Sequence, residues 1–280
     1  MAEMLSYGFM QRAFLAVIGA GILCSVLSFF VVLNRLSFMG AGLSHAMLGG
    51  LAIGVIWGVN PLYTGGIFAV LAASVAGYLS RRGLVESETL IGVLFSSGMA
   101  LGVALISLRE GYHPELFSLL FGNVLAVSPG DLWFLGLVGL AVLGFVGLFF
   151  KELLLITFDE EMALASGLPA TWLYVGLLAA LALTVVASVM VLGVVLASAL
   201  LVIPAASTRP LGLNYRYMLA GAVVLGLSSG GVGLALSFRI AVPSGASIVL
   251  SSTLAFGLCF LAGEMIRRRR SGGGETDARL

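Results

Sequence analysis

Residues 40–58 read GAGLSHAMLGGLAIGVIWG, and this stretch decides how the rest of the chain is interpreted. It is apolar apart from Ser44 and His45, and the chain has only one other histidine. An ionisable side chain inside such a span is costly, so His45 either packs in a protein interior or contacts a substrate. Small residues recur at every fourth position, at Gly42, Ala46, Gly50, Gly54 and Gly58. On a helix they form a stripe that a neighbouring backbone can approach closely, which predicts an interior helix of a membrane bundle.

The same apolar character extends over almost all of the 280 residues, of which 60% are hydrophobic and 10% charged. A soluble domain has about 25% charged residues and cannot cover this much apolar surface. The apolar runs are long and unbroken, unlike the short alternating strands of an outer-membrane barrel. The sequence therefore predicts an all-α polytopic membrane protein surrounded by lipid. The net charge of +1 gives no indication of nucleic-acid binding.

The length and spacing of the apolar runs predict about nine transmembrane helices. The stretch 171–204 is about twice as long as one span needs, and we divide it near Ala187–Val189. Eight spans result if that stretch does not form two full crossings. The other expected spans are about 9–33, 42–57, 62–79, 90–108, 132–150, 218–236 and 246–266.

Basic residues indicate the orientation, because they gather on the cytoplasmic side of a membrane protein. With nine spans and a cytoplasmic C-terminus, the N-terminus lies outside and eleven of the fourteen Lys and Arg residues lie inside. Residues 1–270 are expected to form the transmembrane domain, and residues 271–280 a disordered, glycine-rich cytoplasmic tail. The eleven basic residues expected on the cytoplasmic side are Arg35, Arg81, Arg82, Lys151, Arg209, Arg216, Arg267, Arg268, Arg269, Arg270 and Arg279.

The inner loop 151–170 contains a short predicted helix. Asp159 is expected to cap its first turn, and Gly167 followed by Pro169 is expected to end it. The residues alone leave two interpretations open, a helix that docks a partner and a solvated loop.

Few residues in the chain are suited to covalent chemistry. A GxxxxGK[ST] phosphate loop is absent from the sequence and Lys151 is the only lysine, so we expect any ATP to be hydrolysed by a partner. A Ser-His-Asp or HExxH arrangement is also lacking, which favours transport over catalysis. The candidate metal ligands are His45, Ser44 and, more weakly, His113 of the outer loop. An imidazole suits zinc, manganese or iron, whereas a structural hydrogen bond for His45 and a solvated loop for His113 are the alternatives.

Three regions together resemble the permease subunits of ABC-type zinc, manganese and iron importers, the ABC-3 metal transporter family. The first is residues 35–54, RLSFMGAGLSHAMLGGLAIG, and the second is residues 158–169, FDEEMALASGLP. The third is residues 192–209, LGVVLASALLVIPAASTR, followed by residues 242–250, VPSGASIVL. Their order and spacing match the family over nearly the whole chain.

The resemblance implies a permease similar to type II ABC importers, in the cell membrane of a prokaryote. It implies a homodimer with cytoplasmic ATP-binding subunits and an extracytoplasmic metal-binding protein, carrying zinc ahead of manganese or iron and holding no cofactor of its own. Residues 157–168 would form the coupling helix that docks on the ATPase. The coupling residues would be Phe158, Asp159, Glu160, Glu161, Ala165, Gly167, Leu168 and Pro169. A secondary carrier or channel without an ATPase is the alternative.

One position departs from the family pattern. Many members read Gly-Asp-Ala-Leu-Ser-His where this chain has residues 40–45, GAGLSH, so Ala41 stands at the position of the aspartate. A metal site that used that carboxylate is therefore altered here.

Overall fold

The computed structural model describes residues 7–108, 124–240 and 242–273, and within these ranges the chain is helical with no strand. The described part contains nine segments that are long and apolar enough to cross a membrane, as expected. Eight of them are single helices, and the remaining one, the seventh along the chain, is broken. They are α2 (Gly8–Leu33), α3 (Met39–Trp57), α4 (Pro61–Arg81), α5 (Ser87–Ser107), α7 (Pro129–Leu148), α10 (Ala170–Leu192), the broken segment Val194–Leu211, α13 (Tyr215–Ile240) and α14 (Ser244–Gly273).

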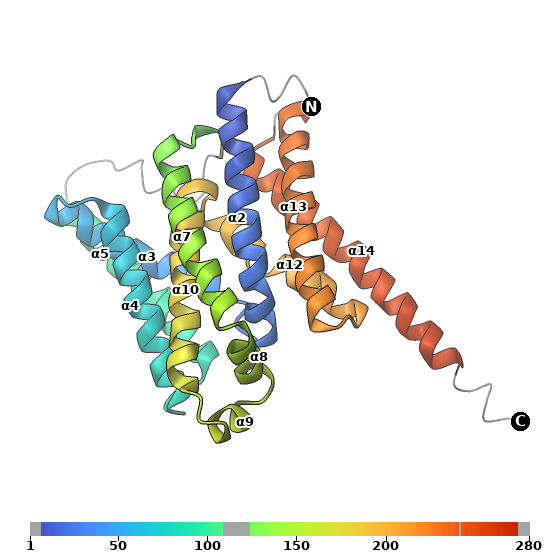
Figure 1. Cartoon of the computed structure of the whole chain (residues 1–280). Coiled ribbons are helices and arrows are strands. Elements are labelled where there is room, and N and C mark those ends of the chain that lie inside the picture. The colour runs from blue at the N-terminus through green and yellow to red at the C-terminus, as the bar shows by residue number, and fades with distance from the viewer. Residues whose placement is uncertain (1–6, 109–123, 241, 274–280) are drawn as a thin grey trace, which may run out of the picture.

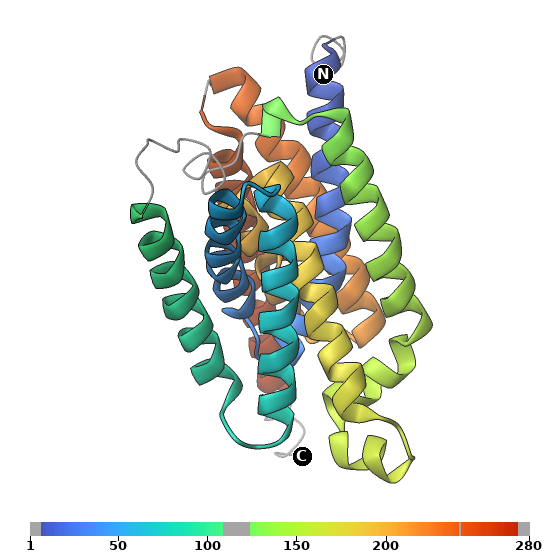
Figure 2. The ribbon, with the colours of Figure 1, turned by 90° about the vertical axis from the view of Figure 1, so that its left-hand side faces the viewer.

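Helices α2 and α10 form the centre of the bundle (Figures 1 and 2). They are apolar all round and mostly buried, as expected of helices that are surrounded by other helices. Helices α3, α4 and α5 pack together on one side, α7 lies beside α2 and α10, and α13 packs between α2 and α14. Helix α2 begins at one end of the bundle and α14 ends at the other, as an odd number of crossings requires.

The small-residue stripe of α3 brings this helix against two different partners. A Cβ on Gly42 would lie 2.9 Å from Ile91 of α5. A Cβ on Gly50 would lie 2.8 Å from the Cα of Gly65 in α4. Positions four apart advance by about 40° beyond a full turn, so the stripe winds from α5 towards α4 along the helix. Gly58 takes no part in this packing, because it is the left-handed C-cap of α3 with a φ of 68°.

The seventh crossing is broken, and the predicted boundary near Ala187–Val189 is wrong. Helix α10 continues through those residues and ends at Gly193, whose φ of 82° and ψ of 164° are open to glycine alone. The segment then consists of α11 (Val194–Leu200), α12 (Ile203–Thr208) and the 3-10 turn η2 (Arg209–Leu211). Gly193 is the only glycine between Gly176 and Gly212, so it is the one position in this stretch that adopts such a conformation without strain.

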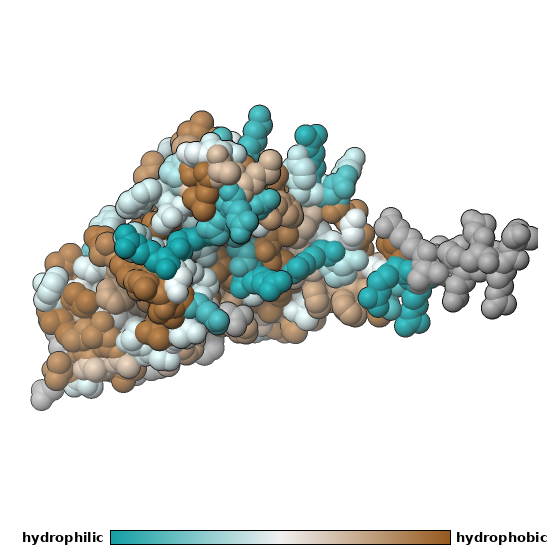
Figure 3. Space-filling model, turned by 90° about the horizontal axis from the view of Figure 1, so that it is seen from below, coloured by the Kyte–Doolittle hydropathy of each residue, from teal (hydrophilic) through white to brown (hydrophobic). Residues whose placement is uncertain are grey.

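The end of the bundle that carries the 151–170 loop is also the basic end. Arg35, Arg82, Lys151, Arg209 and Arg216 are exposed there, in the turns and helix ends of different elements. Seen from below, hydrophilic side chains gather over this end (Figure 3). Exposed large hydrophobic side chains of α7, such as Trp133, Leu137 and Leu140, face outwards, as expected for a surface in contact with lipid.

Candidate functional site

A cleft of about 770 Å³ opens among α2, α3, α5, η2 and α14 at the basic end of the bundle. Its wall is mainly apolar, and the guanidinium groups of Arg35 and Arg209 contribute most of its charge. Arg35 has a φ of 58°, the one positive value at a non-glycine residue in the described ranges, and it turns the chain between α2 and α3. The apolar wall includes Phe38, Ala41, Ile91, Phe95, Phe256 and Phe260.

His45 lies one helical turn beyond the cleft wall, in the second turn of α3. Ala41, four residues earlier and on the same helix face, lines the cleft. The His45 ring contacts the ring of Phe95 at a centroid distance of 4.3 Å, and Phe95 lines the cleft as well. The Nδ1 atom of His45 is buried and has no hydrogen-bond partner in the described part of the chain. An imidazole nitrogen without a partner is therefore separated from the cleft by one aromatic side chain.

Ser44, the other candidate on α3, is committed to its own helix. Its hydroxyl is buried and donates to the Gly40 carbonyl oxygen at 2.8 Å. This is the bond that a serine within a helix usually makes. His113 lies outside the described residues. Within the described ranges no three His, Cys, Asp or Glu side chains gather as they would around a metal ion.

The predicted short helix is present as α9 (Glu160–Ala165), directly after α8 (Phe150–Phe158). The carboxylate of Asp159 accepts a hydrogen bond from the Met162 backbone N–H at 2.9 Å, which is the expected N-cap. Gly167 ends the segment with a φ of 77°. Ala163 is fully buried and holds α9 against the bundle. The helix is therefore a fixed element of this end of the molecule.

The exposed side of α9 is unusually apolar for a solvated loop. Phe158, Met162 and Leu164 are 64%, 58% and 56% exposed. Glu161 and Ala165 are exposed as well, Pro169 follows them at the surface, and Leu168 is half-buried. Glu160 differs from the other predicted coupling residues, since its carboxylate turns back towards the bundle and pairs with Arg81.

Sequence reasoning missed the residues that hold α8 and α9 in place. Asn34, Arg81, Thr157 and Tyr174 come from four different elements and line a second, polar cavity of about 520 Å³ beside α9. Phe95 was missed too. An aromatic residue in an apolar span carries no signal of its own, and only its position against His45 distinguishes it.

The nine apolar crossings within the described residues, with a cleft at the basic end of the bundle, define a multi-pass membrane protein. The model of the ABC 3 transport family matches residues 6–263, and the chain belongs to that family.

The chain is similar to named transport proteins over most of its length. The manganese transport system membrane protein MntC of Halalkalibacterium halodurans is 39% identical, over 92% of this chain and 88% of that protein. The chelated iron transport system membrane protein YfeD of Yersinia pestis is 36% identical, over 91% of this chain and 86% of that protein. A chain of the solved structure of PsaBC from Streptococcus pneumoniae in complex with Fab has a TM-score of 0.80 and 33% identity, over 92% of this chain and 95% of that chain. The chain is thus a permease of the ABC-3 family, with an all-helical fold that these comparisons confirm.

Proposed function

We propose that the chain is the membrane subunit of an ATP-driven importer of a divalent metal ion. The observation that carries the proposal is the partnerless Nδ1 of His45, one aromatic ring away from the cleft at the basic end. A buried imidazole nitrogen without a hydrogen bond is costly in an apolar span, and a passing metal ion would supply the partner that the fold does not provide. The names of the manganese and iron transport relatives support a metal ion as the substrate.

In this proposal the ion passes His45 and then leaves through the cleft. The ring of Phe95 separates the two in this conformation, so a shift of α5 relative to α3 would open the way. Arg35 and Arg209 at the cleft repel a cation, so the cleft does not retain an ion that has passed His45. His45 is then a transient ligand on an inner part of the path, with Ser44 beside it on the same helix.

The donor set favours zinc as the substrate. Of the metals that an imidazole can bind, zinc and iron suit it better than manganese, which prefers oxygen ligands. Ala41 offers no carboxylate on the His45 face of α3, and no acidic cluster lies nearby within the described ranges. Manganese and iron, which the names of the relatives suggest, are the rival substrates.

The energy would come from partner ATPase subunits. The exposed apolar side chains of Met162 and Leu164 in α9, with Phe158 at the end of α8, suit docking in a groove of such a subunit. We propose that α9 is the coupling helix, with Glu161, Ala165, Gly167 and Pro169 at or near the contact. The basic end is then cytoplasmic, the N-terminus lies outside, two permeases work together, and a binding protein delivers the ion.

The test is the ATPase activity of the reconstituted complex with its binding protein. Zinc, manganese and iron are each supplied with the binding protein, and ATP hydrolysis is measured against the metal-free state. Stimulation by a divalent metal, strongest with zinc, is the expected result. A rate of ATP hydrolysis that is equal with and without metal would contradict the proposal. Stimulation that is strongest with manganese would contradict the choice of zinc.

A further inference from the structure

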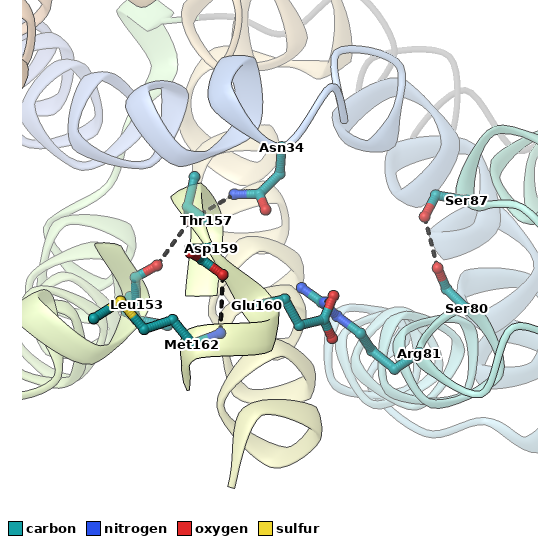
Figure 4. A network of polar contacts seen from close by, with 9 residues as sticks. All are labelled: Asn34, Ser80, Arg81, Ser87, Leu153, Thr157, Asp159, Glu160 and Met162. Carbon is teal, nitrogen blue, oxygen red and sulfur yellow. Dashed lines mark hydrogen bonds and ion pairs between the residues drawn. The ribbon is translucent and has the colours of Figure 1, made fainter. Parts of the chain in front are cut away.

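Besides their buried apolar contacts, helices α8 and α9 are attached to the bundle by two polar contacts, both shown in Figure 4. At the first, the Asn34 side-chain amide at the end of α2 donates to the hydroxyl of Thr157 at 3.1 Å. The Thr157 hydroxyl in turn donates to the Leu153 carbonyl oxygen at 2.7 Å. At the second, the guanidinium of Arg81, in the last turn of α4, forms an ion pair with the carboxylate of Glu160, the first residue of α9.

The second attachment differs from an ordinary surface ion pair. The side chain of Arg81 is only 12% exposed, whereas that of Glu160 is 42% exposed. The Arg81 guanidinium also stacks on the ring of Tyr174 in α10, 3.8 Å from its centroid, and Tyr174 is buried. An exposed pair between flexible side chains contributes little. Here the arginine is held in place by the stack, so the position of α9 is fixed relative to both α4 and α10.

Helix α4 connects this contact to the helix that carries His45. A Cβ on Gly50 of α3 would lie 2.8 Å from the Cα of Gly65 and 2.8 Å from the carbonyl oxygen of Thr64, both in α4. The two backbones therefore touch, without a flexible side chain between them to absorb a displacement. Because packed helices shift as units, a displacement of α4 at Arg81 would move α3 through this contact, which lies near the opposite end of α4.

We propose that the Arg81–Glu160 pair is the contact that transmits a displacement of α9 to α4 and through it to α3. Arg81 is then a positioning residue for transport, and Glu160 faces the bundle rather than an ATPase. The inference rests on the proposed function, in which an ATPase displaces α9. The inward face of α9 then transmits the displacement to α4, and the exposed face around Met162 contacts the ATPase.

The test compares variants of Arg81 and Glu160 in proteoliposomes that contain the permease, its ATPase and its binding protein. Arg81→Gln and Glu160→Gln each remove the pair. The matched control is Arg82→Gln, which removes the same charge from the next residue, an exposed arginine stacked on Tyr78 at 4.7 Å. The reversed pair, Arg81→Glu with Glu160→Arg, restores the attraction. The readout is the number of metal ions transported for each ATP hydrolysed, because misfolded protein lowers both rates and leaves their ratio unchanged.

The expected result is a ratio lowered by roughly 5- to 150-fold in Arg81→Gln and Glu160→Gln, the range typical of coupling between two sites. ATP hydrolysis continues, Arg82→Gln keeps the wild-type ratio, and the reversed pair transports more per ATP than either single variant. Because Glu160 is half-exposed, Glu160→Gln is compatible with folding even if Arg81→Gln is not. A wild-type ratio in Glu160→Gln would overturn the inference alone. Failure of the wild-type complex to transport with ATP would overturn the proposed function as well.

Discussion

Gly98 of α5 lies against the backbone of Ala46 in α3, the residue that follows His45. A Cβ on Gly98 would overlap the Cα of Ala46 and lie 3.2 Å from its backbone nitrogen and from its Cβ. None of these atoms belongs to a side chain that can rotate away. Gly98→Ala therefore forces α3 and α5 apart and displaces Phe95, three residues earlier on α5, from the His45 ring.

Overpacking of this kind costs about 1–3 kcal/mol. In a domain of 150–250 residues each kcal/mol lowers the Tm by about 2–4 °C. The matched control is Gly136→Ala in α7, where a Cβ would meet no atom within 4 Å. There alanine gains up to about 1 kcal/mol from its higher helix propensity. The two variants carry the same chemical change and differ only in the space around it.

The assay is thermal unfolding of the purified protein in detergent, followed by metal uptake in proteoliposomes. Gly98→Ala is expected to unfold at a lower temperature than Gly136→Ala and to transport more slowly at a temperature where both are folded. Equal unfolding temperatures would refute the reasoning, because α3 and α5 would then tolerate a methyl group between their backbones.

Three further predictions concern the path beside the cleft. His45→Ala should lower zinc uptake by at least roughly 10–100-fold, because even the loss of a residue that hydrogen-bonds to a metal ligand costs this much. Wild-type uptake by a fully inserted variant would exclude His45 from the path. Ala41→Asp places a carboxylate one turn from His45 and should raise uptake of manganese relative to zinc, measured by competition between the two ions; an unchanged ratio would show that this face of α3 does not select the metal. Phe95→Ala removes the ring between His45 and the cleft and should allow ion leakage without ATP, measured as efflux from loaded vesicles, and a leak no greater than that of the wild type would show that another group closes the path.

The crossings were predictable from sequence because each depends on a local property, a run of apolar residues long enough for the bilayer. The break in the seventh crossing was misplaced by several residues. Hydropathy does not change at Gly193, and what ends α10 there is a backbone conformation. A rule that gives weight to a lone glycine in a long apolar stretch finds this boundary.

The candidate site was predictable only where its geometry is local. The N-cap at Asp159 joins this residue to Met162, only three positions later in the sequence. His45 is conspicuous as an ionisable group in an apolar run. The contact of Phe95 with His45 and the pairing of Arg81 with Glu160 join segments that are distant in sequence. Their partners are set by how the helices pack, which periodicity does not reveal. The pairing of Glu160 shows the limit, because its place in the short helix α9 follows from local spacing while the direction of its side chain is visible only in the fold.

The most direct test of the central claim is uptake of labelled metal into proteoliposomes that contain the permease with or without its ATPase subunit. The binding protein is supplied outside and ATP inside in both preparations. The ATP-driven function predicts that ions accumulate only when the ATPase and ATP are both present. Uptake at the same rate without the ATPase would contradict it and identify the chain as a secondary carrier or channel.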